Sequence, residues 1–126
     1  MGTTMRGDGL RGATAHQAGR MAEAQVARYY AALGLVLHAA RWRGAGGEID
    51  LILRDGDGFV FVEVKKSRDL ARAAAALGRR QLLRLHAAAT EFLGQQPKGL
   101  RTPARFDVAL VDGQGRVEVI ENALGP

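Results

Sequence analysis

Apolar residues recur along this chain of 126 residues with two different periods. The helical period predicts two helices. The first helix would begin near Thr14 and end before Gly34, with an apolar face made of Ala15, Gly19, Ala22, Val26, Tyr29, Tyr30 and Leu33. The second would extend from about Asp69, a residue type that favours the N-cap position, to Leu93, with a core face made of Leu70, Ala74, Leu77, Gln81, Leu85, Ala88 and Phe92.

Shorter apolar runs predict strands in the remainder of the chain. Three of them, residues 35–42, 46–53 and 61–65, lie between the two helices, and two more, residues 105–111 and 116–121, follow the second helix. This order predicts an α/β fold in which a mixed sheet is flanked by helices. The first three strands would form an antiparallel meander. The second helix would be a crossover that brings residues 106–111 parallel to a central strand.

Charged residues interrupt two of these apolar strands. The first strand reads Gly-Glu-Ile-Asp-Leu-Ile-Leu and contains Asp50, and the second reads Phe-Val-Glu-Val-Lys and contains Glu63 and Lys65. Charged residues are depleted from strands, and burying one without a partner is costly. The two strands therefore carry acids for a reason other than strand formation.

The turn between these strands decides which residue faces Asp50. A turn centred on Gly56 and Asp57 places Asp50 opposite Glu63, whereas a turn centred on either neighbouring Asp-Gly pair places it opposite Phe61 or Lys65. In all three registers the two acids and Lys65 share one face, because side chains alternate along a strand. Carboxylates held that close repel each other unless a cation or a proton lies between them. The hairpin predicts a site for a hard divalent ion, Mg²⁺ or Mn²⁺.

Lys65 has a catalytic interpretation, with two possible roles, and a structural one. Its ammonium group could neutralise a phosphate oxygen or position the attacking water, which requires no change in its pKa and is the role we favour. A role as general base would require a pKa far below the usual value of about 10.4. Alternatively, Glu63 and Lys65 form a half-exposed structural salt bridge on one face of the strand.

Three other polar residues are candidates for the same site. Glu23 lies at the margin of the apolar face of the first helix, where it is either solvated or turned towards the acidic end of the sheet. Glu48 shares the face of Asp50 and is either an additional ligand or a solvated residue at the start of a strand. Gln81 interrupts the apolar face of the second helix, and because a buried amide needs partners, it either bonds to the backbone or reaches the site.

These motifs together resemble the YraN-type family of small bacterial proteins. The resemblance covers most of the chain after about residue 16. Beside the two acidic strands, it includes Gly19-x-x-Ala22-Glu23-x-x-Ala27, Arg43, Arg105-Phe106-Asp107-Val108 and Glu121-Asn122-Ala123. That family is assigned to the restriction-endonuclease-like, PD-(D/E)xK nuclease superfamily. The resemblance implies a restriction-endonuclease-like core with the order αβββαβ.

The resemblance also implies roles for individual residues. Asp50 and Glu63 match the metal-binding acids, Lys65 matches the catalytic lysine, and Glu23 matches an accessory helix acid of resolvase-like relatives. The family usually has a lysine in the long helix, where this chain has Gln81 or the preceding Arg80. Many nucleases of the superfamily use either Gln or Lys at that position.

The charge of the chain favours a polyanionic partner. Lys and Arg number 18 against 13 Asp and Glu, a formal net charge of +5. Part of this charge forms a ridge on the second helix, which is either a solvated face or a phosphate-contacting surface. The residues expected to contact nucleic acid are Arg43, Lys66, Arg68, Arg72, Arg79 and Arg80, with Arg84 adjacent to the ridge.

Length and composition predict a single domain over residues 16–126, preceded by a disordered tail over residues 1–15 that is rich in Gly, Thr and Arg. The tail lacks the apolar core of a signal peptide, and no apolar run approaches the roughly 18 residues of a membrane span. We therefore expect a cytoplasmic protein without a membrane partner. The absence of cysteine excludes disulfides and thiolate metal sites.

The sequence thus predicts a metal-dependent endonuclease that acts on DNA. Asp50, Glu63 and the Val64 carbonyl would hold Mg²⁺ or Mn²⁺, with Glu23 contributing through water. The resolvase-like resemblance suggests branched or processed DNA as substrate and is compatible with a homodimer. Two alternatives remain: a catalytically silent nucleic-acid-binding module, and a protein-interaction adaptor in DNA processing or uptake.

Overall fold

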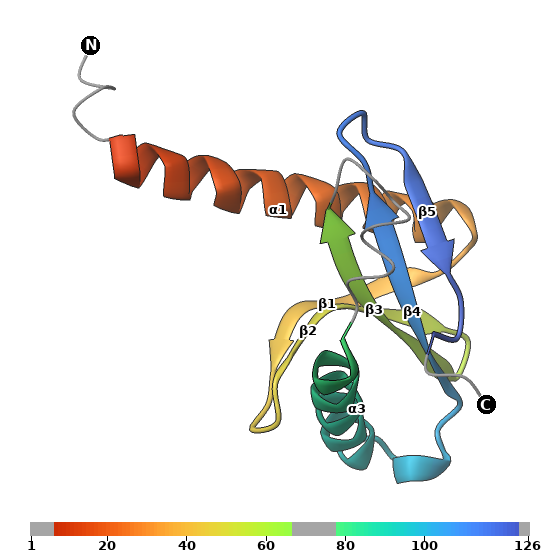
Figure 1. Cartoon of the computed structure of the whole chain (residues 1–126). Helices are drawn as coiled ribbons and strands as arrows, with labels where there is room; N and C mark the ends of the chain where they lie inside the picture. Colours follow the sequence, from red (N-terminus) through yellow and green to blue (C-terminus); the bar gives the residue numbers. More distant parts are fainter. Residues whose placement is uncertain (1–6, 67–77, 124–126) are drawn as a thin grey trace.

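A computed structural model describes residues 7–66 and 78–123 of the chain, with side chains from residue 17 onwards (Figure 1). Along this part of the chain the elements are α1 (Gly7–Ala32), β1 (Val36–Arg43), β2 (Glu48–Asp55), β3 (Gly58–Lys66), α3 (Arg79–Gly94), the 3-10 turn η2 (Gly99–Arg101), β4 (Ala104–Val111) and β5 (Val117–Ile120). This order confirms the predicted α/β class. It is consistent with a restriction-endonuclease-like core.

The five strands form one mixed sheet in the order β1-β2-β3-β4-β5. The β1–β2, β2–β3 and β4–β5 pairs are antiparallel, and β3 and β4 are parallel. Both the meander and the parallel pairing of residues 106–111 with a central strand are confirmed. The connection from β3 to β4 runs through α3, as a parallel pair requires.

The two described helices pack on opposite faces of the sheet (Figure 1). On one face α1 buries Ala22, Val26 and Tyr30 against alternate residues of β2, β3 and β4. On the other face α3 buries its own apolar residues, Leu85, Ala88, Ala89 and Phe92, against the intervening strand residues. Neither helix combines the length and apolar character that crossing a bilayer requires.

Some details of the predicted helices were wrong. The α1 helix begins at Gly7 rather than near Thr14, so residues 7–13, which we assigned to the tail, are helical. Their glycines have poor helix propensity, which is why composition indicated a tail. Tyr29 and Leu33 are 36% and 58% exposed, so the buried face of α1 is narrower than predicted.

The predicted start of the second helix at Asp69, and its core residues Leu70, Ala74 and Leu77, lie outside the described residues. Within the described part, α3 begins at Arg79. Its buried residues include the predicted Leu85, Ala88 and Phe92.

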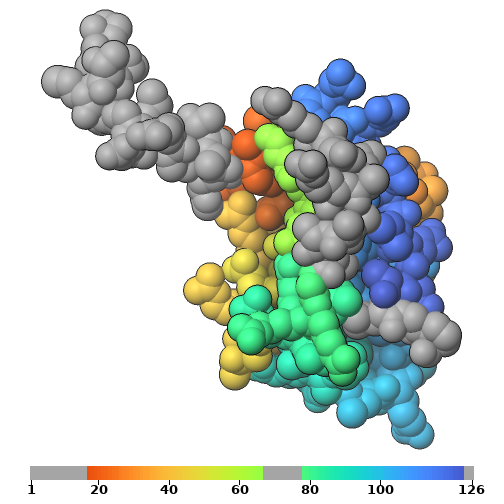
Figure 2. Space-filling view, in the orientation of Figure 1, coloured from red at the N-terminus to blue at the C-terminus, as the bar shows by residue number. Residues whose placement is uncertain are grey.

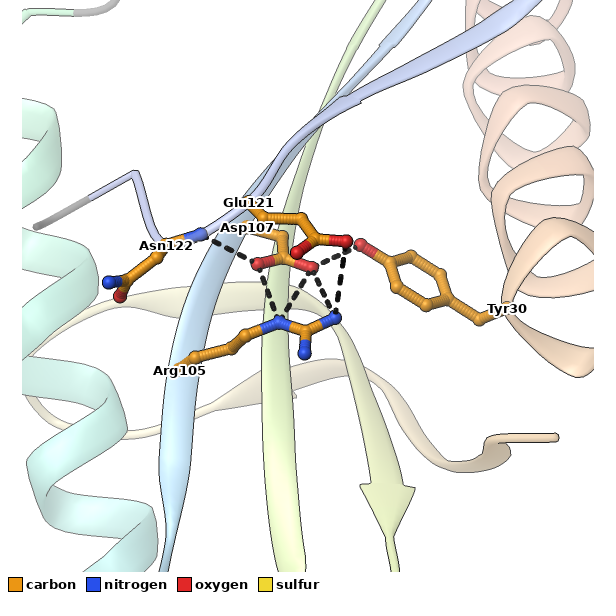
Figure 3. Close-up of polar contacts among 5 residues, drawn as sticks. All are labelled: Tyr30, Arg105, Asp107, Glu121 and Asn122. Carbon is orange, nitrogen blue, oxygen red and sulfur yellow. Dashed lines mark hydrogen bonds and ion pairs between the residues drawn. The ribbon is translucent and has the colours of Figure 1, made fainter. Parts of the chain in front are cut away.

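A buried carboxylate joins α1 to β4 and to the segment that follows β5 (Figure 3). Asp107 in β4 is 0% exposed and accepts hydrogen bonds from the Tyr30 hydroxyl at 2.7 Å, from Arg105 Nε at 3.0 Å and from the Asn122 amide at 3.0 Å. Burial and the neighbouring Asp107 raise the pKa of Tyr30, which keeps its phenol a donor. One side chain thereby fixes α1, β4 and the segment that follows β5.

We expect Asp107→Ala to lower the free energy of unfolding by about 3–5 kcal/mol, because it leaves a partly buried arginine and a buried hydroxyl without their acceptor. Chemical denaturation measures the effect. The matched control is Asp57→Ala, which removes an exposed carboxylate paired with Lys98 at 3.2 Å and should cost less than about 1 kcal/mol. Equal effects of the two substitutions would contradict a structural role for Asp107.

Candidate active site

The β2–β3 hairpin has the register that brings the two acids, Asp50 and Glu63, beside each other. Asp55 pairs with Gly58, so the turn is centred on Gly56 and Asp57, and Leu51 pairs with Val62. The ladder ends at that pair, and continuing the same register brings Asp50 beside Glu63, with both acids lining one cavity. Of the three registers that the sequence allowed, the structure therefore has the first. Gly56, the first central residue of the turn, has a φ of +62°, whereas the φ of Asp57 is not positive, as in a type II′ turn.

Three groups hold the two carboxylates in place. The Val64 amide donates a hydrogen bond to Asp50 Oδ2 at 2.8 Å. Gln81 Nε2 donates a short hydrogen bond to Glu63 Oε2, and Lys65 Nζ lies 3.3 Å from the same oxygen. Of the two roles left open for Gln81, the structure shows the one in which the amide reaches the site. The contact between Glu63 and Lys65 leaves both of the interpretations of Lys65 open.

Burial changes the acidity of one acid of the pair. The Glu63 side chain is 9% exposed. Burial is the largest cause that raises the pKa of Glu63 from 4.5 to about 7, and the charge of Asp50 and hydrogen bonding with it raise the pKa further. The ammonium group of Lys65 acts in the opposite direction. Lys65 therefore offsets only part of the cost of ionising Glu63. A bound cation would favour the ionised carboxylate.

A cavity of about 190 Å³ opens over the acid pair, between the sheet and α3. Its lining residues are Gly47, Glu48, Asp50, Glu63, Gln81, Arg84 and Leu85. The sequence placed Arg84 only next to the ridge. Its spacing of three residues from Gln81 was a usable signal, because residues three apart lie on the same side of a helix.

The acid pair fits a hard cation that shares its ligands with substrate. Among the described residues, no three Asp, Glu or His side chains are grouped closely enough to hold a metal ion. A zinc site needs more protein ligands than this pair supplies. Mg²⁺, by contrast, is commonly held by one or two carboxylates together with substrate phosphates and water. Asp50 and Glu63 have the ligand chemistry for Mg²⁺ or Mn²⁺.

Glu23 is not grouped with the acid pair. It extends from α1, on the opposite face of the sheet, and its Oε1 accepts a hydrogen bond from Arg41 Nε at 3.1 Å. The β1–β2 register places Arg41 across from Asp50, and Arg41 has a φ of +55°. Glu23 therefore reaches the neighbourhood of Asp50 through an arginine, and its role as an accessory acid stays a prediction.

The expected nucleic-acid-binding residues are distributed over several places. Arg43 pairs with Glu48 at 3.2 Å beside the cavity, and Arg79 and Arg80 are exposed at the start of α3. Lys66 lies next to α1 and the β4–β5 turn, away from the acids. Arg68 and Arg72 lie outside the described residues.

The raised pKa of Glu63 predicts how stability depends on pH. A folded-state pKa of about 7 against 4.5 means that folding favours the protonated acid, so this stabilisation is complete below pH 4.5 and is lost as the pH rises through 7. Between pH 5 and pH 8, in metal-free buffer, we expect the Tm of the wild type to fall by roughly 5–10 °C relative to Glu63→Gln. Thermal denaturation followed by circular dichroism measures it.

The control is Glu48→Gln, which removes an acid from the same cavity whose side chain is 40% exposed. The Tm of Glu48→Gln should change with pH by the same amount as the Tm of the wild type over this range. Parallel curves for Glu63→Gln and the wild type would show that Glu63 is not perturbed.

Comparison with known proteins places the chain in a family. Residues 22–111 match the model of the uncharacterised protein family UPF0102. A UPF0102 protein of Ruegeria pomeroyi is 62% identical over 115 residues, which cover 91% of this chain and 94% of the relative. A UPF0102 protein of Cereibacter sphaeroides is 56% identical over 114 residues, covering 90% and 97%, and one of Roseobacter denitrificans is 52% identical over 113 residues, covering 90% and 88%. The resemblance to YraN-type proteins is thereby confirmed, and the chain belongs to the UPF0102 family.

Proposed function

We propose that this protein is a metal-dependent endonuclease that hydrolyses phosphodiester bonds in DNA. The observation that carries the proposal is the juxtaposition of Asp50 and a buried Glu63 at the end of one hairpin, with Lys65 at 3.3 Å from Glu63. Held between the two acids and the Val64 carbonyl, Mg²⁺ or Mn²⁺ would lower the pKa of a bound water and stabilise charge on the reacting phosphate. The same arrangement supports membership of the PD-(D/E)xK nuclease superfamily.

Three residues around the acid pair would have separate roles in binding the phosphate and the metal ion. Gln81 donates to Glu63 Oε2 and so leaves the other oxygen of that carboxylate available as a ligand. Lys65 is 32% exposed, which allows its ammonium group to contact a phosphate oxygen while it stays near Glu63. Arg84 lines the opposite wall of the cavity, where its guanidinium can bind a second phosphate oxygen.

DNA is the substrate that the charge distribution supports. Arg79 and Arg80 at the start of α3, and Arg43 beside Glu48, extend positive charge outward from the cavity. The net charge of +5 favours a polyanion. A preference for branched DNA and a homodimeric state rest on the analogy with resolvases alone.

We expect the protein to cleave linear, single-stranded or four-way-junction DNA in the presence of Mg²⁺ or Mn²⁺. Asp50→Ala, Glu63→Ala and Lys65→Ala should each lower the rate by roughly 10²-fold or more, because each removes charge stabilisation at the reacting phosphate. Gel analysis of end-labelled substrates, with a chelator as blank, measures the rates.

Asp57→Ala is the control for this series, since it removes an acid from the same hairpin at the turn, where Asp57 pairs with Lys98. It should keep the rate of the wild type. Activity that survives in a folded Glu63→Ala protein would reject the site. Salt-dependent DNA binding without cleavage of any substrate would favour the silent binding module, and the absence of both would favour the protein-interaction adaptor.

DNA affinity should depend on the arginines at the start of α3. We expect the double variant Arg79→Ala/Arg80→Ala to bind duplex DNA more weakly and to reduce the slope of log K against log salt by about 2, or about 1 for each phosphate contact. Fluorescence anisotropy at several salt concentrations measures both.

The matched control removes two exposed cations near the other end of α3, Lys98→Ala/Arg101→Ala. That variant should retain the slope of the wild type. Equal slopes in the wild type and both double variants would show that the start of α3 is not part of the DNA-binding surface.

A further inference from the structure

The loop between β1 and β2, residues 44–47, lies against α3 (Figure 2). One carboxylate holds it there. Glu91 Oε1, from the last turn of α3, accepts hydrogen bonds from the Ala45 amide at 2.9 Å and the Gly46 amide at 3.4 Å. This loop leads directly into β2, and Asp50 is the third residue of that strand.

The glycines of the loop make this close approach feasible. A Cβ on Gly44 would lie 2.5 Å from Glu91 Oε1, and a Cβ on Gly46 would lie 3.2 Å from the Cβ of Ala87. The loop also closes on itself through a hydrogen bond from the Gly44 amide to the Gly47 carbonyl at 2.9 Å. Because glycines gain much freedom when they are released, this segment needs an outside contact to stay ordered.

The α3 helix therefore contacts both strands that carry the acid pair. Gln81 binds Glu63 in β3, and Glu91, ten residues and about 15 Å further along the helix, binds the loop that leads to Asp50 in β2. Between the two contacts, Arg84 and Gly47 both line the cavity and lie against each other. A Cβ on Gly47 would lie 3.5 Å from the Arg84 carbonyl oxygen. The same helix therefore holds both Glu63 and the loop before Asp50, and so constrains the distance between the two acids.

We propose that Glu91 is a positioning residue: by fixing the β1–β2 loop on α3, it sets the place of Asp50 relative to Glu63. Its value for catalysis rests on the proposed function, whereas its effect on Asp50 does not. Glu91 contacts neither acid, so its influence passes through the backbone of residues 45–50. Groups that hydrogen-bond metal ligands directly commonly change metal affinity by about 10–100-fold, and Glu91, which acts one step further out, should lie at the lower end of that range.

The Val64 amide supplies a readout that needs neither metal nor activity, because it donates to Asp50 Oδ2. In Glu91→Ala we expect hydrogen exchange at least roughly tenfold faster at Ala45, Gly46 and Val64, measured by NMR without metal. Exchange at Val108 in β4 should not change and serves as the reference for the fold. Asp50→Ala calibrates the Val64 signal, since it removes the acceptor itself.

The matched control is Glu91→Gln, which loses the charge but keeps an oxygen acceptor at the same place. It should retain most of the protection at Val64. Mn²⁺ titration, followed by paramagnetic broadening of the Val64 and Gly47 signals, should show roughly tenfold weaker binding for Glu91→Ala and little change for Glu91→Gln.

A second pair of variants disturbs the same contact without touching Glu91. Gly46→Ala places its new Cβ 3.2 Å from Ala87 and should push the loop away, which would reproduce the faster exchange at Val64. Adding Ala87→Gly removes the obstructing methyl group and should restore protection. This rescue separates a positional effect from general destabilisation of α3, which Ala87→Gly would by itself increase.

The outcomes distinguish the inference from the proposed function. Faster exchange confined to Ala45 and Gly46, with Val64 and Mn²⁺ binding unchanged, would overturn the inference. Faster exchange at Val64 in a protein that binds no Mn²⁺ would support the positioning role and reject the metal site. Loss of protection at Val108 in Glu91→Ala, without rescue of Gly46→Ala by Ala87→Gly, would show that Glu91 merely stabilises the fold.

Discussion

The register of the β2–β3 hairpin is the constraint on which the rest of this structure depends. Side chains of β3 alternate between the two cores, with Val60 and Val62 against α1 and Phe59 and Phe61 against α3. A slip of one residue would exchange these sets, so that each core would receive side chains of the wrong size and shape, and Glu63 would face α1 instead of α3. Burying an apolar side chain contributes roughly 1.5–3 kcal/mol, so these four together outweigh the cost of about 3 kcal/mol implied by the raised pKa of Glu63. The apolar alternation therefore forces the acids together.

Features of the fold and of the site that depend on residues close together in the sequence could be predicted, and those that depend on residues far apart could not. The shared face of Asp50, Glu63 and Lys65 follows from the strand period, and a short turn limited the register to three choices. The partner of Gln81 could not be decided, because it depends on where α3 lies over the sheet. No local signal marked Glu91, whose partners are backbone amides 45 and 46 residues away. The start of α1 was misplaced because its glycines disfavour the helix they belong to.

Two of the buried acids, Asp107 and Glu63, show why a buried acid needs to be judged by its partners. Asp107 is enclosed by donors from Tyr30, Arg105 and Asn122, so its charge is satisfied within the protein. This accounts for the Arg-Phe-Asp-Val and Glu-Asn-Ala motifs as parts of a structural junction. Glu63 has one amide and one ammonium group as partners, with a second carboxylate opposite. Of these two acids, only Glu63 retains unsatisfied charge beside a cavity.

That unsatisfied charge also limits what the site can bind alone. Two carboxylates leave most of the coordination sphere of Mg²⁺ to water and substrate, so the ion and the phosphate should assist each other in binding. The position of Lys65 fits this coupling, since its ammonium group, which partly neutralises Glu63 in the free protein, would become available to the phosphate if a cation took over that task. A site built in this way would bind metal weakly in the absence of nucleic acid. The energetic link between the two ligands, rather than metal affinity as such, is what would separate a nuclease from a binding module with the same fold.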